Sequence, residues 1–155
     1  MDDAAPAPVM RVMLAALLLA ALLLAGCGGG DGDRAGRLAR AGASPDLPAL
    51  LRVADADAGR RAFGQCAACH TIGAGGQALA GPNLHAILGR PVAGDPRFGY
   101  TQALKDHGGR WDDARMDAWL AAPARVVPGT RMAFAGVRDP MERADLIAYL
   151  RSAGR

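Results

Sequence analysis

A Cys-x-x-Cys-His motif constrains this chain more than any other feature of its sequence. It consists of Cys66, Cys69 and His70, with two alanines between the cysteines. The pattern is the attachment signature for c-type haem, in which two thiols on one helical turn add to the two vinyl groups of the macrocycle. The adjacent imidazole then ligates the iron. A bare Cys-x-x-Cys pair also fits a redox dithiol or half of a zinc site, so both stay open as alternatives.

The first 26 residues are predicted to be a secretory signal. Arg11 precedes an apolar run over residues 12–25, and a positive residue before such a run is typical of a signal peptide. The run is shorter than the ~17 residues usually needed to span a bilayer. Met10 is an alternative start, because Asp2 and Asp3 make the preceding residues a poor signal n-region.

Residues 24–27, Leu-Ala-Gly-Cys, resemble a bacterial lipobox. The resemblance implies that Cys27 carries lipid and becomes the mature N-terminus, which accounts for the third cysteine. An ordinary signal peptide, or a short uncleaved anchor, with a free Cys27 is the alternative. Residues 27–54 contain many glycines and two X-Pro steps, so we expect a flexible tether there. We expect the folded domain of residues 55–155 to be held at the periplasmic face of a bacterial membrane.

The charge of the chain argues against a nucleic-acid partner. The net charge is +3, and no block of five or six like charges is present, as a nucleic-acid-binding tail would require. A mildly basic protein that docks on acidic partner surfaces fits the composition better.

The domain is predicted to be all-α, because no alternating strand pattern and no internal repeat is present. Helices are expected over about residues 57–66, 101–106 and 113–121, with a last helix that begins at Asp139-Pro140 and ends before Gly154. Gly59 lies on the apolar face of the first helix. We expect it to let the first and last helices approach closely where they cross.

Met132 is the candidate for a second iron ligand. Met132 follows Pro128 and Gly129 in a loop, and a thioether is a soft, neutral ligand that raises the haem potential. The loop is suited to bring this sulfur to the iron from the side opposite His70. The alternative is a core methionine, the usual fate of a buried one.

From Gly59 to Ala153 the chain resembles a class I cytochrome c, close to the mitochondrial type and its bacterial relatives. The matching segments follow the family's order and are residues 66–71, 81–85, 88–90, 98–101, Trp111, 128–136 and 142–150. The resemblance implies the class I cytochrome c fold, a small helical domain wrapped around a covalently bound haem.

The resemblance implies that His70 and Met132 are the two axial ligands of the iron. The carbonyl of Pro82 would then accept a hydrogen bond from the His70 ring, which orients the imidazole and raises its donor strength. His85 and His107 are expected to be exposed or structural residues rather than ligands.

Other residues would contact the haem around its edge, if the resemblance extends to them. Tyr100 and Trp111 would donate hydrogen bonds to an inner propionate, and Arg90 would help to neutralise it. Thr130 would support the same side of the haem, and Phe134 would pack beside its exposed edge. The alternatives are a core role for Trp111 and a solvated surface position for Arg90.

Three features of the sequence depart from the family pattern. Trp119 stands where a tyrosine usually donates to the methionine sulfur, and Leu104 replaces a residue that is polar in the mitochondrial type. Lys105 is the only lysine of the chain, so most of the family's lysine docking ring is missing. Arginines are candidates to replace part of that ring, although the two side chains are not interchangeable: Arg110, Arg115, Arg125, Arg131 and Arg138.

These features together predict a monomeric one-electron carrier with one haem c and no enzymatic activity. From the family, the expected donor is a quinol–cytochrome c reductase or a dehydrogenase, and the expected acceptor is a terminal oxidase or another reductase. The alternative is a haem enzyme, peroxidase-like or gas-binding, in which Met132 is a labile ligand. Trp119 is the feature that favours this alternative.

Overall fold

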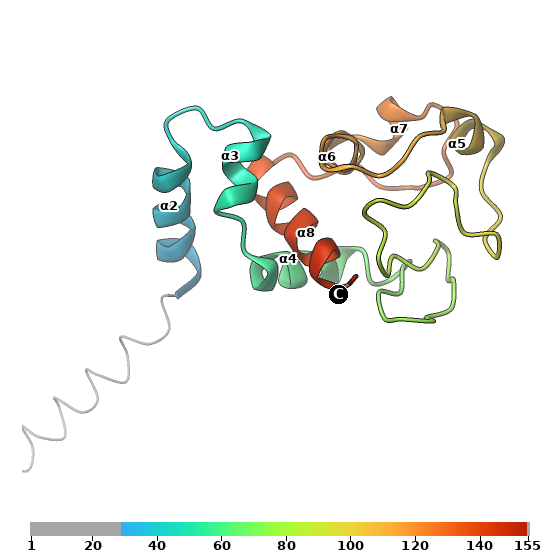
Figure 1. Ribbon diagram of the computed structural model, residues 1–155, viewed down its shortest axis with the longest axis horizontal. Helices are drawn as coiled ribbons and strands as arrows, with labels where there is room; N and C mark the ends of the chain where they lie inside the picture. Colours follow the sequence, from blue (N-terminus) through green and yellow to red (C-terminus); the bar gives the residue numbers. More distant parts are fainter. Residues whose placement is uncertain (1–28, 155) are drawn as a thin grey trace, which may run out of the picture. The chain divides into compact units, whose positions relative to one another are not determined.

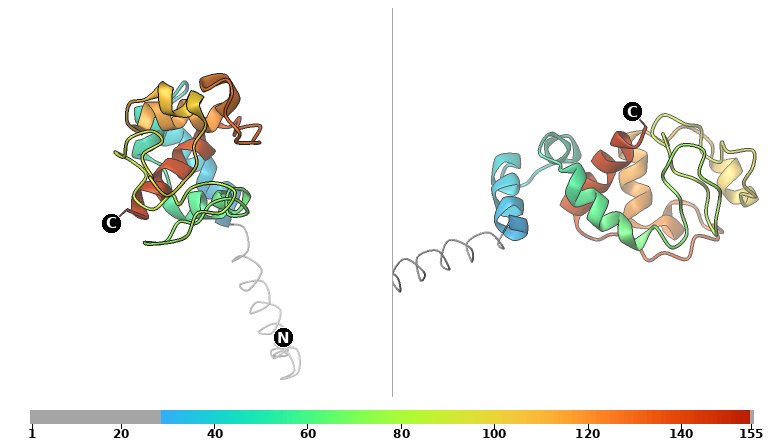
Figure 2. Two further views of the ribbon diagram at one scale, coloured as in Figure 1. Left: turned by 90° about the vertical axis from the view of Figure 1, so that its right-hand side faces the viewer. Right: turned by 90° about the horizontal axis from the view of Figure 1, so that it is seen from below.

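A computed structural model describes residues 29–154, and all of its regular elements in that range are helical (Figures 1 and 2). The chain forms two compact units, Met1–Arg37 and Leu38–Arg155. The first is described only from residue 29, where it forms the first part of α2 (Gly29–Ala41). The predicted signal peptide and Cys27 lie outside the described residues. No helix in the described range is long and apolar enough to cross a membrane.

The second unit contains the remaining helices. They are α3 (Leu47–Arg52), α4 (Ala56–Ala62), the 3-10 turn η1 (Phe63–Gln65), α5 (Gln102–His107), α6 (Asp113–Ala121), α7 (Pro123–Val126) and α8 (Pro140–Ser152). The predicted α4, α5, α6 and α8 are present, and the all-α prediction is confirmed for these residues. The short α7 was not predicted; it begins at a proline, which is suited to the first turn of a helix.

Helices α4 and α8 cross closely at Gly59, as the sequence predicts. A Cβ atom added at Gly59 would lie 2.0 Å from the backbone oxygen of Asp145 and 2.8 Å from the Cβ of Tyr149. Just beyond the crossing, the rings of Phe63 and Tyr149 meet edge to face with their centroids 5.3 Å apart. The buried Asp145 carboxylate accepts a 2.8 Å hydrogen bond from the backbone N–H of Asp55, which fixes the start of α4 against α8.

Both crossing helices begin at a capping aspartate. Asp55 accepts hydrogen bonds from the next turn of α4, and Asp139 does the same for α8, which continues with Pro140. These contacts satisfy N–H groups that a helix start otherwise leaves unpaired. Helix α8 also packs against α3 and α6, so it lies at the centre of the unit (Figure 1).

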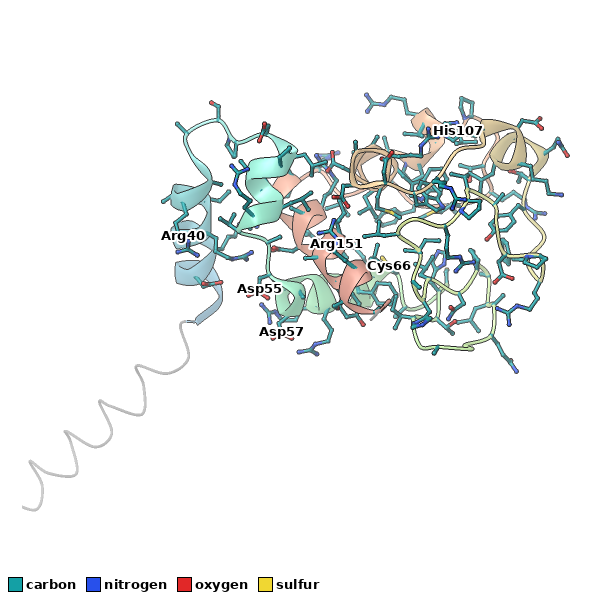
Figure 3. The ribbon with its side chains drawn as sticks, in the orientation of Figure 1. Arg40, Asp55, Asp57, Cys66, His107 and Arg151 are labelled. Carbon is teal, nitrogen blue, oxygen red and sulfur yellow. The ribbon has the colours of Figure 1, made fainter. Side chains whose placement is uncertain are left out.

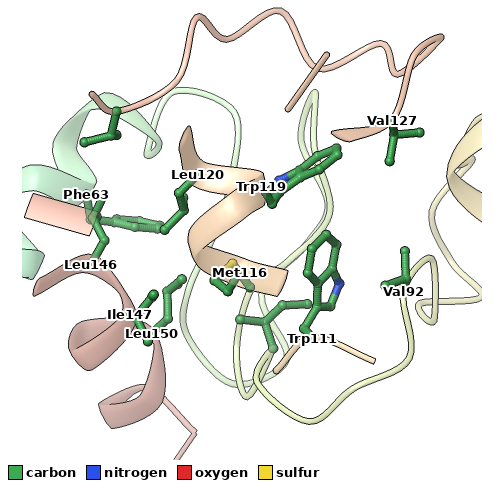
Figure 4. Packing of buried hydrophobic residues seen from close by; sticks show 12 residues of the cluster. Phe63, Val92, Trp111, Met116, Trp119, Leu120, Val127, Leu146, Ile147 and Leu150 are labelled. Carbon is green, nitrogen blue, oxygen red and sulfur yellow. The ribbon is translucent and has the colours of Figure 1, made fainter. Parts of the chain in front are cut away.

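The main hydrophobic core lies between α8, α6 and the loops that follow η1 (Figure 4). Leu146 and Ile147 supply it from α8, and Met116 and Leu120 from α6. Residues 66–101 run almost entirely as loops on one side of this core (Figure 2). The helices therefore serve as a frame, and the residues of the predicted site lie mostly on the loops.

The predicted flexible tether over residues 27–54 is wrong for its second half. Leu47–Arg52 is helical. The side-chain oxygen of Asp46 accepts a 2.9 Å hydrogen bond from the Ala49 N–H and so caps the helix, and Pro48 lies in its first turn, where a proline favours a helix start. Leu50 is 3% exposed and packs with Met141 and Ala144 of α8. Residues 29–41 are also helical, over a stretch that ends in good helix formers such as Ala, Arg and Leu.

We expect Leu50→Ala to lower the free energy of unfolding by about 2–5 kcal/mol, because it opens a cavity between α3 and α8. A segment that served only as a tether would show almost no effect. Urea unfolding of the haem-loaded chain measures the difference. Ser44→Ala, at an exposed position before α3, is the control and should leave the midpoint unchanged.

Candidate functional site

Both cysteines of the motif lie on one helical turn that continues from η1. The backbone N–H groups of Cys69 and His70 each donate to the carbonyl oxygen of Cys66 at 3.0 Å. Cys66 is half-buried at the start of this turn (labelled in Figure 3), Cys69 is exposed, and both thiols are free. Burial raises the pKa of the Cys66 thiol, and the nearby Cys69 and Glu142 raise it further. The turn thus carries two thiols three residues apart, as attachment to one macrocycle requires.

The imidazole of His70 is oriented by a backbone carbonyl. Its Nδ1 lies 2.8 Å from the carbonyl oxygen of Pro82, and a carbonyl only accepts, so Nδ1 carries the proton. The lone pair is therefore on Nε2, the nitrogen available to a metal. Burial lowers the pKa of His70, and the Pro82 hydrogen bond partly opposes that shift. Burial, the larger of the two effects, favours the neutral ring, which is the form that binds iron.

Gly81 packs directly against the His70 ring. A Cβ atom added at Gly81 would lie 2.3 Å from the Cε1 atom of His70 and 2.7 Å from both ring nitrogens. The Gly81 N–H also donates to the Cys69 carbonyl oxygen at 2.8 Å. The backbone of residues 81–82 thus forms one wall against the imidazole, and any side chain at Gly81 would displace the ring.

A buried amide ties this wall to the motif. Asn83 is 5% exposed, and its Nδ2 donates to the hydroxyl of Thr71 at 2.7 Å and to the Gly73 carbonyl at 3.0 Å. Its Oδ1 accepts from the backbone N–H of His85 at 3.0 Å. The three hydrogen bonds of this one side chain link both ends of the loop that follows His70.

A cluster of polar side chains lies farther along the same loops. The guanidinium of Arg90 donates to the carbonyl of His85 at 3.2 Å and lies 4.0 Å from the carboxylate of Asp95. Asp95 is 4% exposed and is bound by Arg97, whose hydrogen bonds lower the pKa of that carboxyl group. Burial raises the pKa of Tyr100, while the Asp95 backbone and the charge of Arg90 lower it. The structure thus brings together Arg90 and Tyr100, two of the three residues predicted to contact a propionate.

Two tryptophans form the wall between α6 and the loops. Trp111 and Trp119 are both buried, with ring centroids 5.4 Å apart and an interplanar angle of 60° (Figure 4). The backbone of Trp111 exchanges hydrogen bonds with Gly89 and Arg90, so the indole is fixed to the loop that carries Arg90. Trp119 is one of the departures from the family pattern, and it is buried in the core.

Met132 and Phe134 lie in the loop between α7 and α8. Both are half-buried and pack against the main core. The hydroxyl of Thr130 accepts from the Met132 N–H at 3.3 Å, and Arg131 donates to the Gly99 carbonyl at 2.6 Å. The Arg131 hydrogen bond holds the loop against Gly99. Ligation of iron by Met132, and the roles of Thr130 and Phe134 beside a haem, stay predictions.

Comparison with known proteins identifies the family. Residues 56–154 match the family model described as cytochrome c. The chain belongs to the cytochrome c family. It is 42% identical over 99 residues to cytochrome c2 of Agrobacterium tumefaciens, covering 62% of this chain and 89% of that one. It is 38% identical over 107 residues to a cytochrome c homolog of Rickettsia bellii, covering 69% of this chain and 62% of that protein.

The match to several relatives is longer than the match to the family model. A cytochrome c homolog of Bradyrhizobium diazoefficiens is 40% identical over 125 residues, covering 79% of this cytochrome and 66% of that protein. The cytochrome therefore spans less than two thirds of the length of this homolog and of the Rickettsia homolog. Members of the family are electron-transfer proteins rather than enzymes, and they bind haem c covalently through a cysteine pair.

The residues of the cytochrome fit that cofactor. Cys66 and Cys69 offer free thiols one turn apart, and His70 offers Nε2 with its ring held from the other side. Gly81 leaves no space for a side chain at the ring. Cys66 and Cys69 are the covalent attachment site for one haem c, which decides against the dithiol and zinc alternatives.

Three residues of the site were not singled out from the sequence for the roles that they have. Gly81 supports the His70 ring, Asn83 holds the loop, and Asp95 pairs with arginines. Gly81 and Asn83 lie in a segment that resembles the family, but the resemblance alone did not indicate a role for either residue. Asp95 carried no signal, since an aspartate in a Gly- and Pro-rich loop is most often exposed.

Proposed function

We propose that this cytochrome is a one-electron carrier in which His70 and Met132 are the axial ligands of the iron. The bond from His70 Nδ1 to the Pro82 carbonyl at 2.8 Å is the observation that carries the proposal, because it fixes the tautomer and orientation that iron ligation needs. When bound, haem c supplies the one-electron couple. Family membership favours this function over the haem-enzyme alternative.

The side chains around the site support electron transfer in three ways. Two axial ligands would fill both coordination positions and keep substrates off the metal. The buried Trp111 and Trp119 exclude water from one wall. Arg90 and Tyr100 place a positive charge and a hydroxyl together, where they would hold a propionate.

The proposed setting is the periplasmic face of a bacterial membrane, with Cys27 lipidated after cleavage of residues 1–26. A quinol–cytochrome c reductase or a dehydrogenase would donate electrons, and a terminal oxidase or another reductase would accept them. Attachment to the membrane would raise the local concentration of the carrier near such partners. Loss of oxidase-linked electron flow on deletion of the gene supports these partners, and unchanged flow refutes them. A mass increase on Cys27 that Cys27→Ser removes tests the anchor.

A pair of methionine variants tests the axial ligands. Met132→Leu and Met116→Leu both remove a sulfur and nearly conserve volume, but Met116 is a buried core residue on α6. We expect Met132→Leu to abolish the weak ferric charge-transfer band of methionine-ligated haem and to lower the reduction potential, because a thioether favours ferrous iron. Met116→Leu should change neither. Retention of both properties in Met132→Leu would overturn the proposed ligation.

A further inference from the structure

A buried carboxylate lies close to the two residues proposed to hold the haem propionate. Asp95 is 4% exposed, and it lies in the loop that connects Arg90 to Tyr100. Burial of a charged carboxylate is unfavourable unless cations or hydrogen bonds compensate for the lost hydration. The groups around Asp95 therefore decide whether a charge is held there and what it acts on.

Arg97 holds the charged form of Asp95. The backbone N–H of Arg97 donates to Oδ1 of Asp95 at 3.0 Å, and its guanidinium donates to Oδ1 at 3.1 Å and to Oδ2 at 3.3 Å. These hydrogen bonds lower the pKa of the Asp95 carboxyl group, so it is charged at neutral pH. The Arg97 side chain is itself 69% exposed, so water screens its charge more strongly than that of the carboxylate.

The conformation of the loop does not require this charge. The hydrogen bond from the Arg97 N–H to the side chain of Asp95 spans two residues, which is the Asx-turn pattern that asparagine forms as well as aspartate. An asparagine at this position would make the same turn without a charge to bury. The negative charge, rather than the turn, is therefore the feature that needs a functional explanation.

Arg90 is the second cation that faces Asp95. Its Nη1 donates to the carbonyl oxygens of His85 at 3.2 Å and Asn83 at 3.4 Å, while its Nη2 lies 4.0 Å from Oδ2 of Asp95. The last separation is too long for a hydrogen bond, so the two charges attract each other while Nη2 can still donate to another acceptor. The Arg90 side chain is mostly buried, which limits the screening of this attraction by water.

We propose that the negative charge of Asp95 lowers the reduction potential of the haem by offsetting the positive charge of Arg90. The proposal rests on the proposed function, in which Arg90 and Tyr100 hold a haem propionate. With its charge offset, Arg90 neutralises the propionate less completely. The more negative surroundings favour ferric over ferrous iron, because ferric iron carries one more positive charge. Asp95 acts through Arg90 and the propionate, so it is a positioning residue and not a ligand.

Redox titration of the full haem-loaded chain against a mediator of known potential tests the proposal. Asp95→Asn removes the charge but keeps an oxygen for the turn, and we expect it to raise the equilibrium constant for reduction about 3- to 10-fold. Asp95→Glu keeps the charge and should stay within about twofold of the wild type. Asp57 is exposed on α4 and lies 3.4 Å from Arg60, so Asp57→Asn makes the same charge change beside an arginine and should also stay within about twofold.

Three results would overturn the proposal. An equilibrium constant for Asp95→Asn within twofold of the wild type would show that the carboxylate has no influence on the iron. Equal increases in Asp95→Asn and Asp57→Asn would reflect the net charge of the chain and not this site. An equal increase in Asp95→Glu would mean that packing of the loop, and not the charge, determines the potential.

The ferric spectrum of each protein separates this proposal from the proposed function. A wild type without the band of methionine-ligated haem contradicts the proposed ligation, whereas the role of Asp95 is judged from potentials among proteins that keep the band. Asp95→Ser is a second neutral variant that can form a similar turn, and it supplies the comparison if Asp95→Asn loses the band. Loss of the band in both neutral variants would also overturn the proposal, because the carboxylate would then be needed for the fold of the site.

Discussion

Replacing Gly59 by alanine is expected to lower the free energy of unfolding of the haem-loaded chain by about 3 kcal/mol, at the upper end of the usual cost of overpacking. The added Cβ would lie 2.0 Å from the backbone oxygen of Asp145, which is far inside van der Waals contact. A backbone atom cannot rotate away as a flexible side chain does, so α8 itself must move. That movement would also strain the 2.8 Å bond between Asp55 and Asp145 and the Phe63–Tyr149 ring contact.

Gly64→Ala is the matched control for Gly59→Ala. Gly64 is five residues farther along in η1, and a Cβ added there would meet nothing within 4 Å. Alanine also reduces the entropy of the unfolded chain, so Gly64→Ala should be neutral or stabilising by up to about 1 kcal/mol. Urea unfolding of both variants gives the comparison. Similar losses at the two positions would mean that general glycine effects, and not the helix crossing, determine the result.

The sequence was sufficient to predict the helices that frame the site. The prediction of the α4–α8 crossing rested on one glycine on the apolar face of α4. Helix α8 was predicted from its capping aspartate, the proline that follows it and the helical spacing of its apolar residues. Such signals act within one or two turns, so they are visible without tertiary information. The attachment motif was equally local, since Cys66, Cys69 and His70 lie on a single turn.

The same local signals were misjudged at α3. The X-Pro step at Leu47-Pro48 favours a flexible tether, but Asp46 caps a helix here and the proline occupies its first turn. The sequence contained both signals for a helix start. What decided between the two outcomes was burial of Leu50 against Met141 and Ala144, nearly a hundred residues away in sequence, and a local pattern holds no information about such a contact.

The loops of the site were beyond prediction from the residues alone. Asn83 reaches Thr71 and Gly73 across a segment without periodicity, and Asp95 is buried between Arg97 and Arg90. These side-chain contacts require a particular path of the loop backbone. That path is itself stabilised by the same contacts, so neither can be predicted without the other. The family resemblance indicated that Pro82 faces His70, but it did not indicate why the preceding residue must be glycine.

Replacing Gly81 by alanine is expected to displace the His70 imidazole. The new Cβ would lie 2.3 Å from Cε1 and 2.7 Å from Nδ1. The ring must therefore swing away from the wall, and its bond to the Pro82 carbonyl is lost. Loss of such a supporting hydrogen bond typically costs about 10–100-fold in metal affinity. A less electron-rich imidazole also stabilises ferric iron less well, so the reduction potential should rise.

Gly73→Ala controls for the effect of a glycine substitution in the same loop, because a Cβ at Gly73 would meet nothing within 4 Å. It should keep the wild-type spectrum and potential. For Gly81→Ala we expect covalent attachment to persist, since Cys66 and Cys69 are untouched, while the redox titration shifts upward and the iron–imidazole bond breaks at a higher pH during acid titration. That shift follows because a more weakly held ligand is protonated sooner. An unchanged potential and acid transition in Gly81→Ala would show that the ring tolerates the contact and that the Pro82 carbonyl does not control its position.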